Sequence, residues 1–492
     1  MSKRSKELKN ANNWKSFATL TDAGYYDLKT EDIEDVPVRL FLTPSLLQEA
    51  EDILYRQIVN ATRFPGVRLV VITPDAHYGY GVPVGCVMLT DADSGAVAMG
   101  PVGYDIGCGM MSARSYVPAE AATPEKRLAF NRAVMERVEM GAGGRSRRLG
   151  AVSESEFNNL VRGGAEYYVE KYGATFDRSR AERHRIPVDD DWQIPWGGRG
   201  RPERGLDQFG SLGGGNHFIE LQRSNETGTI FVQVHTGSRG FGHGLATNYF
   251  DIARAERPDV ITDIDLGYFT PDSRHYKDYL NAVAAGGNYA IINRLVIFEQ
   301  VAEAFREVFR ADLELIYEIS HNLVQREWHP EFGEVWVHRK GATRAFPAGH
   351  PALAGTLWAE TGHPVLIPGS NKDWSYILRP LPGAAKSGYS VNHGAGRRLS
   401  RGEAARRLDQ RRIDDEYRAA GILVNTDGRV PLDEAAPCYK SSAEVVAAVV
   451  GAGLAEVEHR LWPLASLKGT DGAPARRKDK RSREPEKSSD HY

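Results

Sequence analysis

Short apolar runs recur along the chain, and most of them end at a polar residue that is followed by glycines. Runs of this length, rich in Val, Ile and Phe, predict buried strands. We expect strands at 67–72, 95–99, 229–234, 313–319, 334–337, 365–368 and 389–392, and one that follows a glycine-rich turn within 212–221. The polar residues therefore lie at strand ends, where loops can present them for chemistry.

Apolar residues at helical spacing predict a second set of elements. These helices are expected at 44–61, 123–140, 154–172 and 279–309. Thr123-Pro124 is typical of a helix start, and Gly286-Gly287 should weaken or bend the last helix. Helices interspersed with strands predict an α+β (mixed α/β) fold.

Some segments do not fit this pattern. The first forty residues are expected to form a peripheral cap, and 141–148 a flexible basic loop. Residues 178–204 mix Arg, Asp, Pro, Gly and Trp, which predicts an irregular surface excursion, either a lid or an RNA-facing loop. Residues 471–492 are charged with almost nothing to bury, which predicts a disordered tail.

Composition narrows the class of protein without choosing a partner. The chain has 492 residues, 41% hydrophobic and 26% charged, with a formal net charge of −3. This balance is typical of a folded globule and neither supports nor excludes a nucleic acid as partner. The length allows two or three domains or one elaborate domain. Three dispersed cysteines predict a reducing, cytoplasmic setting, and without a signal peptide or a long apolar run we expect no membrane span.

A ten-residue stretch with three glycines holds Asp105 and Cys108, which suit a divalent metal ion. His217, His235 and His321 end or adjoin other predicted strands. A carboxylate, a thiolate and three imidazoles suit Mn, Zn, Co or Fe(II) better than Mg, and a bridging thiolate would let two ions share them. The alternative, that each histidine is an ordinary hydrogen-bonded core residue, stays open because local metal motifs such as HExxH are absent.

Glycine-rich loops at 213–215, 237–244 and 394–396 have Arg, Asn or Ser nearby, a pattern that can cradle phosphate groups. Such loops also serve simply as turns. His393 follows a predicted strand and precedes glycine, so it could attack an activated phosphate and carry it as a phosphoramidate, or else act as a metal ligand or core residue. P-loop and Rossmann fingerprints are absent from the sequence.

Seven strings in the chain, spread over roughly residues 70 to 470, occur in the order found in one known family. They are Asp75-Ala-His-Tyr-Gly-Tyr-Gly, Gly103-Tyr-Asp-Ile-Gly-Cys108, Gly214-Gly-Asn-His217-Phe-Ile-Glu220, His235-Thr-Gly-Ser-Arg239-Gly, Ser320-His321-Asn322, His338-Arg-Lys-Gly-Ala-Thr-Arg-Ala-Phe-Pro347 and His393-Gly-Ala-Gly-Arg397. Together they resemble the signature segments of the RtcB family of RNA ligases.

The resemblance implies one large catalytic domain over 1–470, with the active site in a central cleft at strand ends and the tail at 471–492 outside it. It implies a GTP-dependent enzyme that joins RNA 2′,3′-cyclic phosphate or 3′-phosphate ends to 5′-hydroxyl ends, in RNA splicing or RNA repair. The intermediates would be a histidine–GMP adduct and an activated RNA end carrying GMP. It leaves open the physiological RNA, the oligomeric state and whether an archease-like activator is a partner.

The resemblance also assigns roles to residues of this chain. Cys108 would bridge two Mn²⁺ ions, with Asp105 and His217 completing one site and His235 and His321 the other. His393 would be the guanylylated nucleophile. The expected nucleotide contacts are Asn216, Phe218, Glu220, Ser370, Ser375, Gly394, Ala395, Gly396, Tyr439 and Lys468, and the expected phosphate or RNA contacts are Arg239, Lys340 and Arg397.

Two other functions remain alternatives to the ligase. One is a metal-dependent phosphoesterase acting on cyclic phosphates or RNA ends. The other is a nucleotide- or RNA-binding protein with a structural metal. The three functions differ at His393, because only the ligase requires a covalent GMP adduct on that residue.

Overall fold

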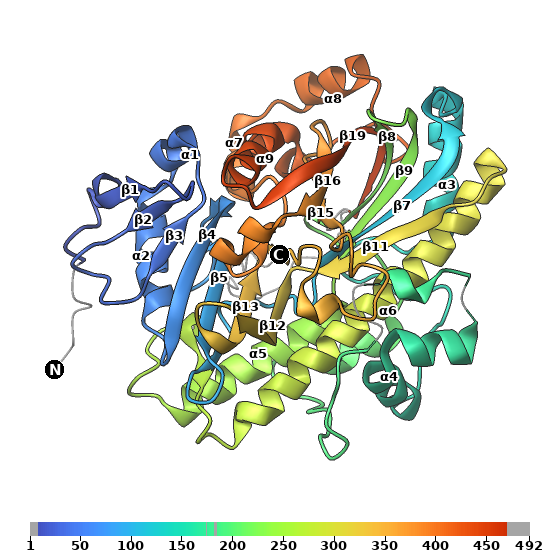
Figure 1. Ribbon diagram of the computed structural model, residues 1–492. Helices are drawn as coiled ribbons and strands as arrows, with labels where there is room; N and C mark the ends of the chain where they lie inside the picture. The colour runs from blue at the N-terminus through green and yellow to red at the C-terminus, as the bar shows by residue number, and fades with distance from the viewer. Residues whose placement is uncertain (1–7, 174, 182–184, 470–492) are drawn as a thin grey trace, which may run out of the picture.

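The computed structural model of the chain describes residues 8–173, 175–181 and 185–469. Two large sheets with helices packed around them make a mixed α/β fold, as predicted (Figure 1). The expected tail at 471–492 lies outside the described residues. The two large sheets and the way they meet define the fold.

The first sheet has the strand order β1-β2-β3-β4-β5-β13-β12. Its strands are β1 (Ala18–Leu20), β2 (Tyr26–Leu28), β3 (Val38–Leu40), β4 (Val67–His77), β5 (Val84–Asp91), β12 (Asn322–His329) and β13 (Gly333–Lys340). The N-terminal residues that we expected to form a cap thus supply the outer strands of this sheet. β4 continues beyond the predicted 67–72, so that Asp75 and His77 stand at its end.

The second sheet has the order β11-β7-β9-β8-β19-β16-β15, with β18 beside β19. Its strands are β7 (Gly109–Pro118), β8 (Phe218–Ser224), β9 (Thr229–Thr236), β11 (Glu314–Ser320), β15 (Val365–Ile367), β16 (Ser375–Pro380), β18 (Leu423–Val424) and β19 (Ala455–Lys468). Two small sheets pair β6 (Val97–Ala98) with β10 (Tyr268–Phe269) and β14 (Ala342–Arg344) with β17 (Ser390–Asn392). Sequence patterns did not predict β7 and β19, whose apolar residues are interspersed with polar ones.

The helices follow the predicted pattern only in part. They are α1 (Pro44–Glu49), α2 (Asp52–Thr62), α3 (Pro124–Arg137), α4 (Glu154–Tyr172), α5 (Arg239–Glu256), α6 (His275–Phe309), α7 (Arg401–Arg407), α8 (Gln410–Ala419) and α9 (Ser442–Gly451). Of these, α5, α7, α8 and α9 were not predicted, and α5 begins at Arg239, inside the stretch 237–244 that was expected to be a glycine-rich loop. The predicted bounds of α4 are confirmed, but Gly164 has non-helical backbone angles, so that the helix is kinked there. The Thr123 side chain caps α3 by accepting from Lys126 N. The single helix expected at 44–61 is wrong, because Ala50 and Glu51 are extended and separate two helices.

The long helix α6 is not interrupted at Gly286-Gly287, contrary to the expectation that the glycines would weaken or bend it. The glycines instead allow a close approach of the loop that precedes Cys108. A Cβ on Gly286 would lie 2.9 Å from Ile106 Cγ2, and a Cβ on Gly107 would lie 3.0 Å from Gly287 Cα. The predicted ligand loop therefore lies directly on α6.

The segment 178–204 is irregular, as expected, apart from short 3₁₀ turns. Most of its described side chains are exposed or half-buried, but Val188 and Trp192 pack into the main hydrophobic core. Two asparagines of α6 bind its backbone, with Asn281 Oδ1 accepting from Asp189 N and Asn288 Oδ1 from Ile186 N. The described part is therefore a surface segment that is anchored to the core at a few residues.

The cysteines are free buried thiols, as the dispersed count predicts. Within residues 8–173, 175–181 and 185–469, no helix has the length and apolarity needed to cross a bilayer.

Candidate active site

Strand register brings the predicted metal ligands to the junction between the two sheets. β7 begins directly after Cys108 and pairs with the end of β9, which holds His235, and with the end of β11, which leads into His321. β8, which follows His217, pairs with the other side of β9. After His321 the chain passes straight into β12 of the first sheet. Four side chains from distant parts of the sequence therefore meet at one point.

The first group of ligand atoms comes from Asp105, Cys108 and His217, and these atoms lie within 4.8 Å of one another. His217 Nε2 is 3.1 Å from Asp105 Oδ2 and 3.6 Å from Cys108 Sγ. The other ring nitrogen of His217 donates to the carbonyl of Leu212 at 3.0 Å. Since that carbonyl can only accept, Nδ1 is a donor, and Nε2 is the nitrogen that His217 would offer to a metal ion.

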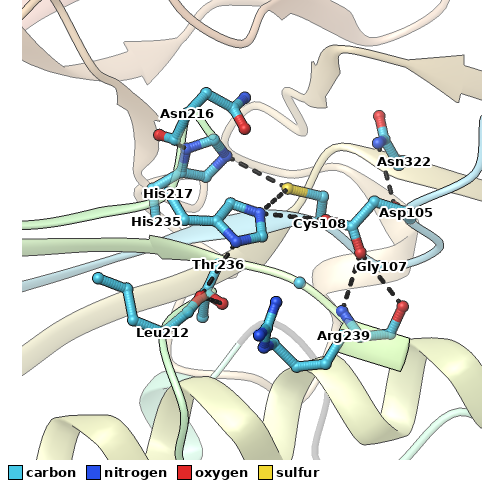
Figure 2. A network of polar contacts seen from close by, with 12 residues as sticks. Asp105, Gly107, Cys108, Leu212, Asn216, His217, His235, Thr236, Arg239 and Asn322 are labelled. Atoms are coloured by element: carbon cyan, nitrogen blue, oxygen red, sulfur yellow. Dashed lines mark hydrogen bonds and ion pairs between the residues drawn. The ribbon is translucent and has the colours of Figure 1, made fainter. Parts of the chain in front are cut away.

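The second group comes from Cys108, His235 and His321, whose ligand atoms again lie within 4.8 Å of one another, so that Cys108 belongs to both groups. Figure 2 shows the Cys108 sulfur facing the rings of His217 and His235. His235 Nε2 is 3.3 Å from Cys108 Sγ and 3.4 Å from His321 Nε2. His235 Nδ1 donates to the Asn216 carbonyl at 3.0 Å, so its Nε2 also carries a lone pair. His321 Nδ1 is buried with no hydrogen-bond partner among the described residues.

Burial decides the charge of these groups. It lowers the pKa of His235 and His321 well below the usual value, which keeps both imidazoles neutral, the form that binds metal. Burial, aided by Asp105, raises the pKa of the Cys108 thiol. Burial alone would raise the pKa of Asp105, but the hydrogen bond and charge of His217 bring it to about 2.

The donor set fits a divalent transition metal. A carboxylate, a sulfur and imidazole lone pairs converge on one space, and lone pairs that face one another repel unless a cation lies between them. A metal ion of this kind would displace the thiol proton and make Cys108 a thiolate. The partition into two groups that share Cys108 is the one that the sequence analysis assigned.

His393 stands beside this cluster at the end of β17. Pairing of β17 with β14 sets it against Gly341, where an added Cβ would lie 2.9 Å from His393 Cε1. Its ring centroid is 4.8 Å from that of His321. His393 Nδ1 lies 2.6 Å from Oδ2 of Asp75, which also accepts from the backbone N–H of His393 at 3.1 Å and of Gly394 at 3.3 Å.

Asp75 is fully buried, yet its pKa is lowered. Burial opposes ionisation, but the facing His393 imidazole outweighs it, with a 2.6 Å hydrogen bond from Thr73 Oγ1 in support. A carboxylate at this position requires a proton on His393 Nδ1 and leaves Nε2 as the free nucleophilic nitrogen. Asp75 lies in the first of the seven strings, but the resemblance assigned it no role.

A cavity of about 520 Å³ opens beside His393. Its wall holds nearly all the residues expected to contact a nucleotide: Asn216, Phe218, Glu220, Ser370, Gly394, Ala395, Gly396, Tyr439 and Lys468. Ser375 is the exception, because it lies behind the wall at the start of β16. Its hydroxyl accepts from Gly369 N at 3.0 Å and from Gln222 Nε2 at 3.1 Å, so it supports the wall and does not form it.

At the far end of this cavity, an aromatic ring lies beside buried charged side chains. Lys468 Nζ lies 5.4 Å from the ring centroid of Phe218 and 3.2 Å from Glu434 Oε2. Burial raises the pKa of Glu220 to about 7. Glu434 is buried and also binds Arg397 Nη1 at 3.1 Å, so that Arg397 lines the wall with its charge already paired. Sequence reasoning missed Glu434, which lies outside all seven strings.

A second cavity of about 340 Å³ lies on the other side of the metal ligands. Arg239 and Lys340 line it, while Asn216 and His393 line both cavities. Lys340 Nζ donates to the carbonyls of Tyr80 and Val82, and burial lowers its pKa to about 8. Arg239 Nη2 donates to the carbonyl of Ala142 at 3.1 Å. His393 and the metal ligands thus separate a larger cavity from a smaller, cation-lined one.

Comparison with known proteins points to one family. The family model described as tRNA-splicing ligase RtcB matches residues 57–469. The chain is similar to the tRNA-splicing ligase RtcB of Pyrobaculum aerophilum, at 35% identity over 89% of this chain and 95% of that protein. It is similar to the RNA-splicing ligase RtcB of Mycobacterium tuberculosis, at 36% identity over 84% and 100%. The tRNA-splicing ligase RtcB of Thermococcus kodakarensis is 34% identical over 88% and 95%.

Proposed function

The chain belongs to the RtcB family of tRNA-splicing ligases, and from this we propose that it joins RNA 2′,3′-cyclic phosphate or 3′-phosphate ends to 5′-hydroxyl ends with GTP, through a covalent GMP adduct on His393. The observation that supports the adduct most directly is the contact between Asp75 and His393. A carboxylate fixed on Nδ1 leaves Nε2 unprotonated beside a cavity large enough for a nucleotide.

In the first step, His393 Nε2 attacks the α-phosphorus of GTP. The bond to the bridging oxygen breaks and pyrophosphate leaves. The ring gains positive charge as the N–P bond forms, and the Asp75 carboxylate 2.6 Å away stabilises that charge. Burial of Asp75 excludes water from this pair, which strengthens the interaction.

In the later steps, water first hydrolyses a 2′,3′-cyclic phosphate, where the RNA end carries one, by breaking its P–O2′ bond to leave a 3′-phosphate and a 2′-hydroxyl. An oxygen of the 3′-phosphate then attacks the phosphorus of the adduct, and His393 leaves as a neutral imidazole. The RNA end then carries GMP through a diphosphate linkage. The 5′-hydroxyl of the second RNA attacks the 3′-phosphate, the phosphodiester forms and GMP departs. The cation-lined second cavity, with Arg239 and Lys340, is suited to the RNA phosphates because its side chains are positive and face the same histidine.

Asp105, Cys108 and His217 would hold one divalent ion, and Cys108, His235 and His321 the other. Two ions there, Mn²⁺ in this proposal, would neutralise phosphate charge and polarise the phosphate under attack. Glu220, Lys468 and Phe218 line the cavity beside His393. In this proposal Glu220 and Lys468 bond the edge of guanine, with Phe218 against its face.

The test is the covalent adduct. The full chain is incubated with Mn²⁺ and α-³²P-labelled GTP and examined for acid-labile label on the protein. We expect labelling in the wild type and none in His393→Ala, and ligation of RNAs with defined ends only when both GTP and Mn²⁺ are present. Absence of label in an active, metal-loaded wild type would contradict the mechanism. Hydrolysis of cyclic phosphate by His393→Ala without ligation would favour the phosphoesterase alternative.

A further inference from the structure

The core of the molecule contains an arginine that sequence reasoning did not notice. Arg294 lies in the middle of α6 and has none of its surface exposed. A charged side chain at such depth needs a full set of partners, since burying an unpaired charge costs several kcal/mol. Its partners are therefore informative about why it is there.

All the partners of Arg294 lie in the segments that carry the metal ligands. Nη1 donates to the carbonyl of Gly107 at 2.7 Å and to that of Thr236 at 3.0 Å. Nη2 donates to Ser320 Oγ at 2.8 Å. Nε donates to Glu318 Oε1, and Glu318 is itself fully buried on β11.

Each of the first three partners is the sequence neighbour of a ligand. Gly107 precedes Cys108, Thr236 follows His235, and Ser320 precedes His321. One planar guanidinium thus links the loop before β7, the end of β9 and the end of β11. Its donors are held in a fixed fork, so the distances between these segments follow from a rigid group and not from flexible contacts.

We propose that Arg294 is a positioning residue that holds Cys108, His235 and His321 at the spacing required for a shared metal ion. This role rests on the metal centre of the proposed function. Arg294 is not itself a ligand, and it acts through the carbonyls of Gly107 and Thr236 and the hydroxyl of Ser320. Removing outer-shell partners of this kind typically weakens metal binding by about 10- to 100-fold.

The chain offers a matched control. Arg339 and Glu327 form a second buried ion pair, with Nη1 to Oε1 at 2.6 Å and Nη2 to Oε2 at 2.8 Å. This pair joins β12 and β13, and neither residue lines the cavity that contains the metal ligands. Loss of either pair should destabilise the fold, but only loss of Arg294 should disturb the ligands.

The experiment is a Co²⁺ titration of the purified full chain, followed by the thiolate-to-cobalt absorption of Cys108 and by the visible cobalt bands. The variants are R294M/E318Q and R339M/E327Q, in which both charges of a pair are removed so that no charge is left buried and unpaired. We expect R294M/E318Q to bind Co²⁺ at least 10-fold more weakly, with an altered spectrum. R339M/E327Q should stay within about twofold of the wild type.

Urea unfolding separates stability from positioning, because both double variants should lose stability. If R294M/E318Q does not fold, R294K answers the same question: it keeps the charge but lacks the fork, and we expect intermediate weakening. Wild-type affinity and spectrum in the Arg294 variants, or equal weakening in R339M/E327Q, would overturn the role of Arg294 alone. A wild type that binds no Co²⁺ would overturn the metal centre itself and this role with it.

Discussion

Replacing Asp75 by Asn tests how the nucleophile is prepared. Asp75 Oδ2 accepts three hydrogen bonds, from His393 Nδ1 and from the backbone N–H groups of His393 and Gly394. An Asn that keeps its oxygen toward these donors has lost the negative charge. An Asn that turns its NH₂ toward the ring forces the proton onto Nε2, where it blocks attack.

The size of the effect follows from the geometry. When Nε2 forms the bond to phosphorus, the ring becomes cationic beside the Asp75 carboxylate. Two unit charges about 4 Å apart, at an effective dielectric constant of about 20, attract by about 4 kcal/mol. A neutral hydrogen bond to Asn retains about 1 kcal/mol of this. The remaining difference of about 3 kcal/mol corresponds to a slowing of about 100-fold, and the wrong tautomer would increase it further.

The assay is single-turnover formation of the GMP adduct, with enzyme in excess over labelled GTP so that the rate constant reports the first chemical step. Glu327→Gln is the matched control, because it also neutralises a buried carboxylate, one that binds Arg339 away from both cavities. We expect a loss of stability in both variants but a slow adduct step only in Asp75→Asn. A rate constant for Asp75→Asn within about threefold of the wild type would refute the reasoning, since neither charge nor tautomer would then matter.

Three further predictions concern the pocket, the shared ligand and the loop. Burial raises the pKa of Glu220 to about 7, and only its ionised form accepts hydrogen bonds from guanine N–H groups. The affinity for GTP, measured by calorimetry, should therefore fall about tenfold for each pH unit below pH 7 and stay constant above it. Glu220→Gln should flatten this profile, and tighter binding at low pH would contradict the assignment. Cys108→Ala should remove the shared ligand, so that elemental analysis finds one bound metal ion or none in place of two. The control variant Cys86→Ala should keep both metal ions. Two bound ions in Cys108→Ala would exclude a bridging role for Cys108. In Gly107→Ala, the new Cβ would sit on a residue with φ of +76° and lie 3.0 Å from the α6 backbone. This variant should lower the free energy of unfolding by about 2–4 kcal/mol. The control is Gly150→Ala, where φ is +64° but the space around the new Cβ is open, and it should lose only about 1–2 kcal/mol. Equal losses in urea unfolding would show that the close approach does not matter.

Local patterns predicted the elements whose stability is mostly local. The apolar run at 229–234 lies within β9, and the helix at 154–172 is α4 with the expected bounds. β7 and β19 escaped prediction because they pair on both sides within a sheet, so long-range hydrogen bonds make up for a weak alternation of apolar residues. The single helix expected at 44–61 was wrong because the local pattern was misleading there. The helical spacing of apolar residues continues across a polar stretch whose side chains are not buried, and the helix is interrupted at that stretch.

The same difference between local and long-range information applies to the candidate site. The candidate metal ligands and His393 could be proposed from the sequence because each lies in a short recognisable string, and most of these strings contain glycine. The partner of His393 was not, because Asp75 is 318 residues away along the chain and no spacing rule relates them. The same holds for Glu434, whose buried contacts join it to Arg397, 37 residues away along the chain, and to Lys468, 34 residues away.

The long helix α6 explains how irregular loops can hold so many residues of the site in place. Loop backbone lacks the ladder bonds of a sheet, and its buried N–H and C=O groups must find other partners. Asn288, Asn293 and Arg294 provide them from the buried interior of the helix, with Asn293 bonding the backbone of Gly210, Ser211 and Gly237. Because such a helix is buried on nearly all sides, its hydrophobic periodicity hides these polar positions. Polar residues within a long apolar helix are therefore where a sequence of this kind should be searched for the groups that hold its ligand loops.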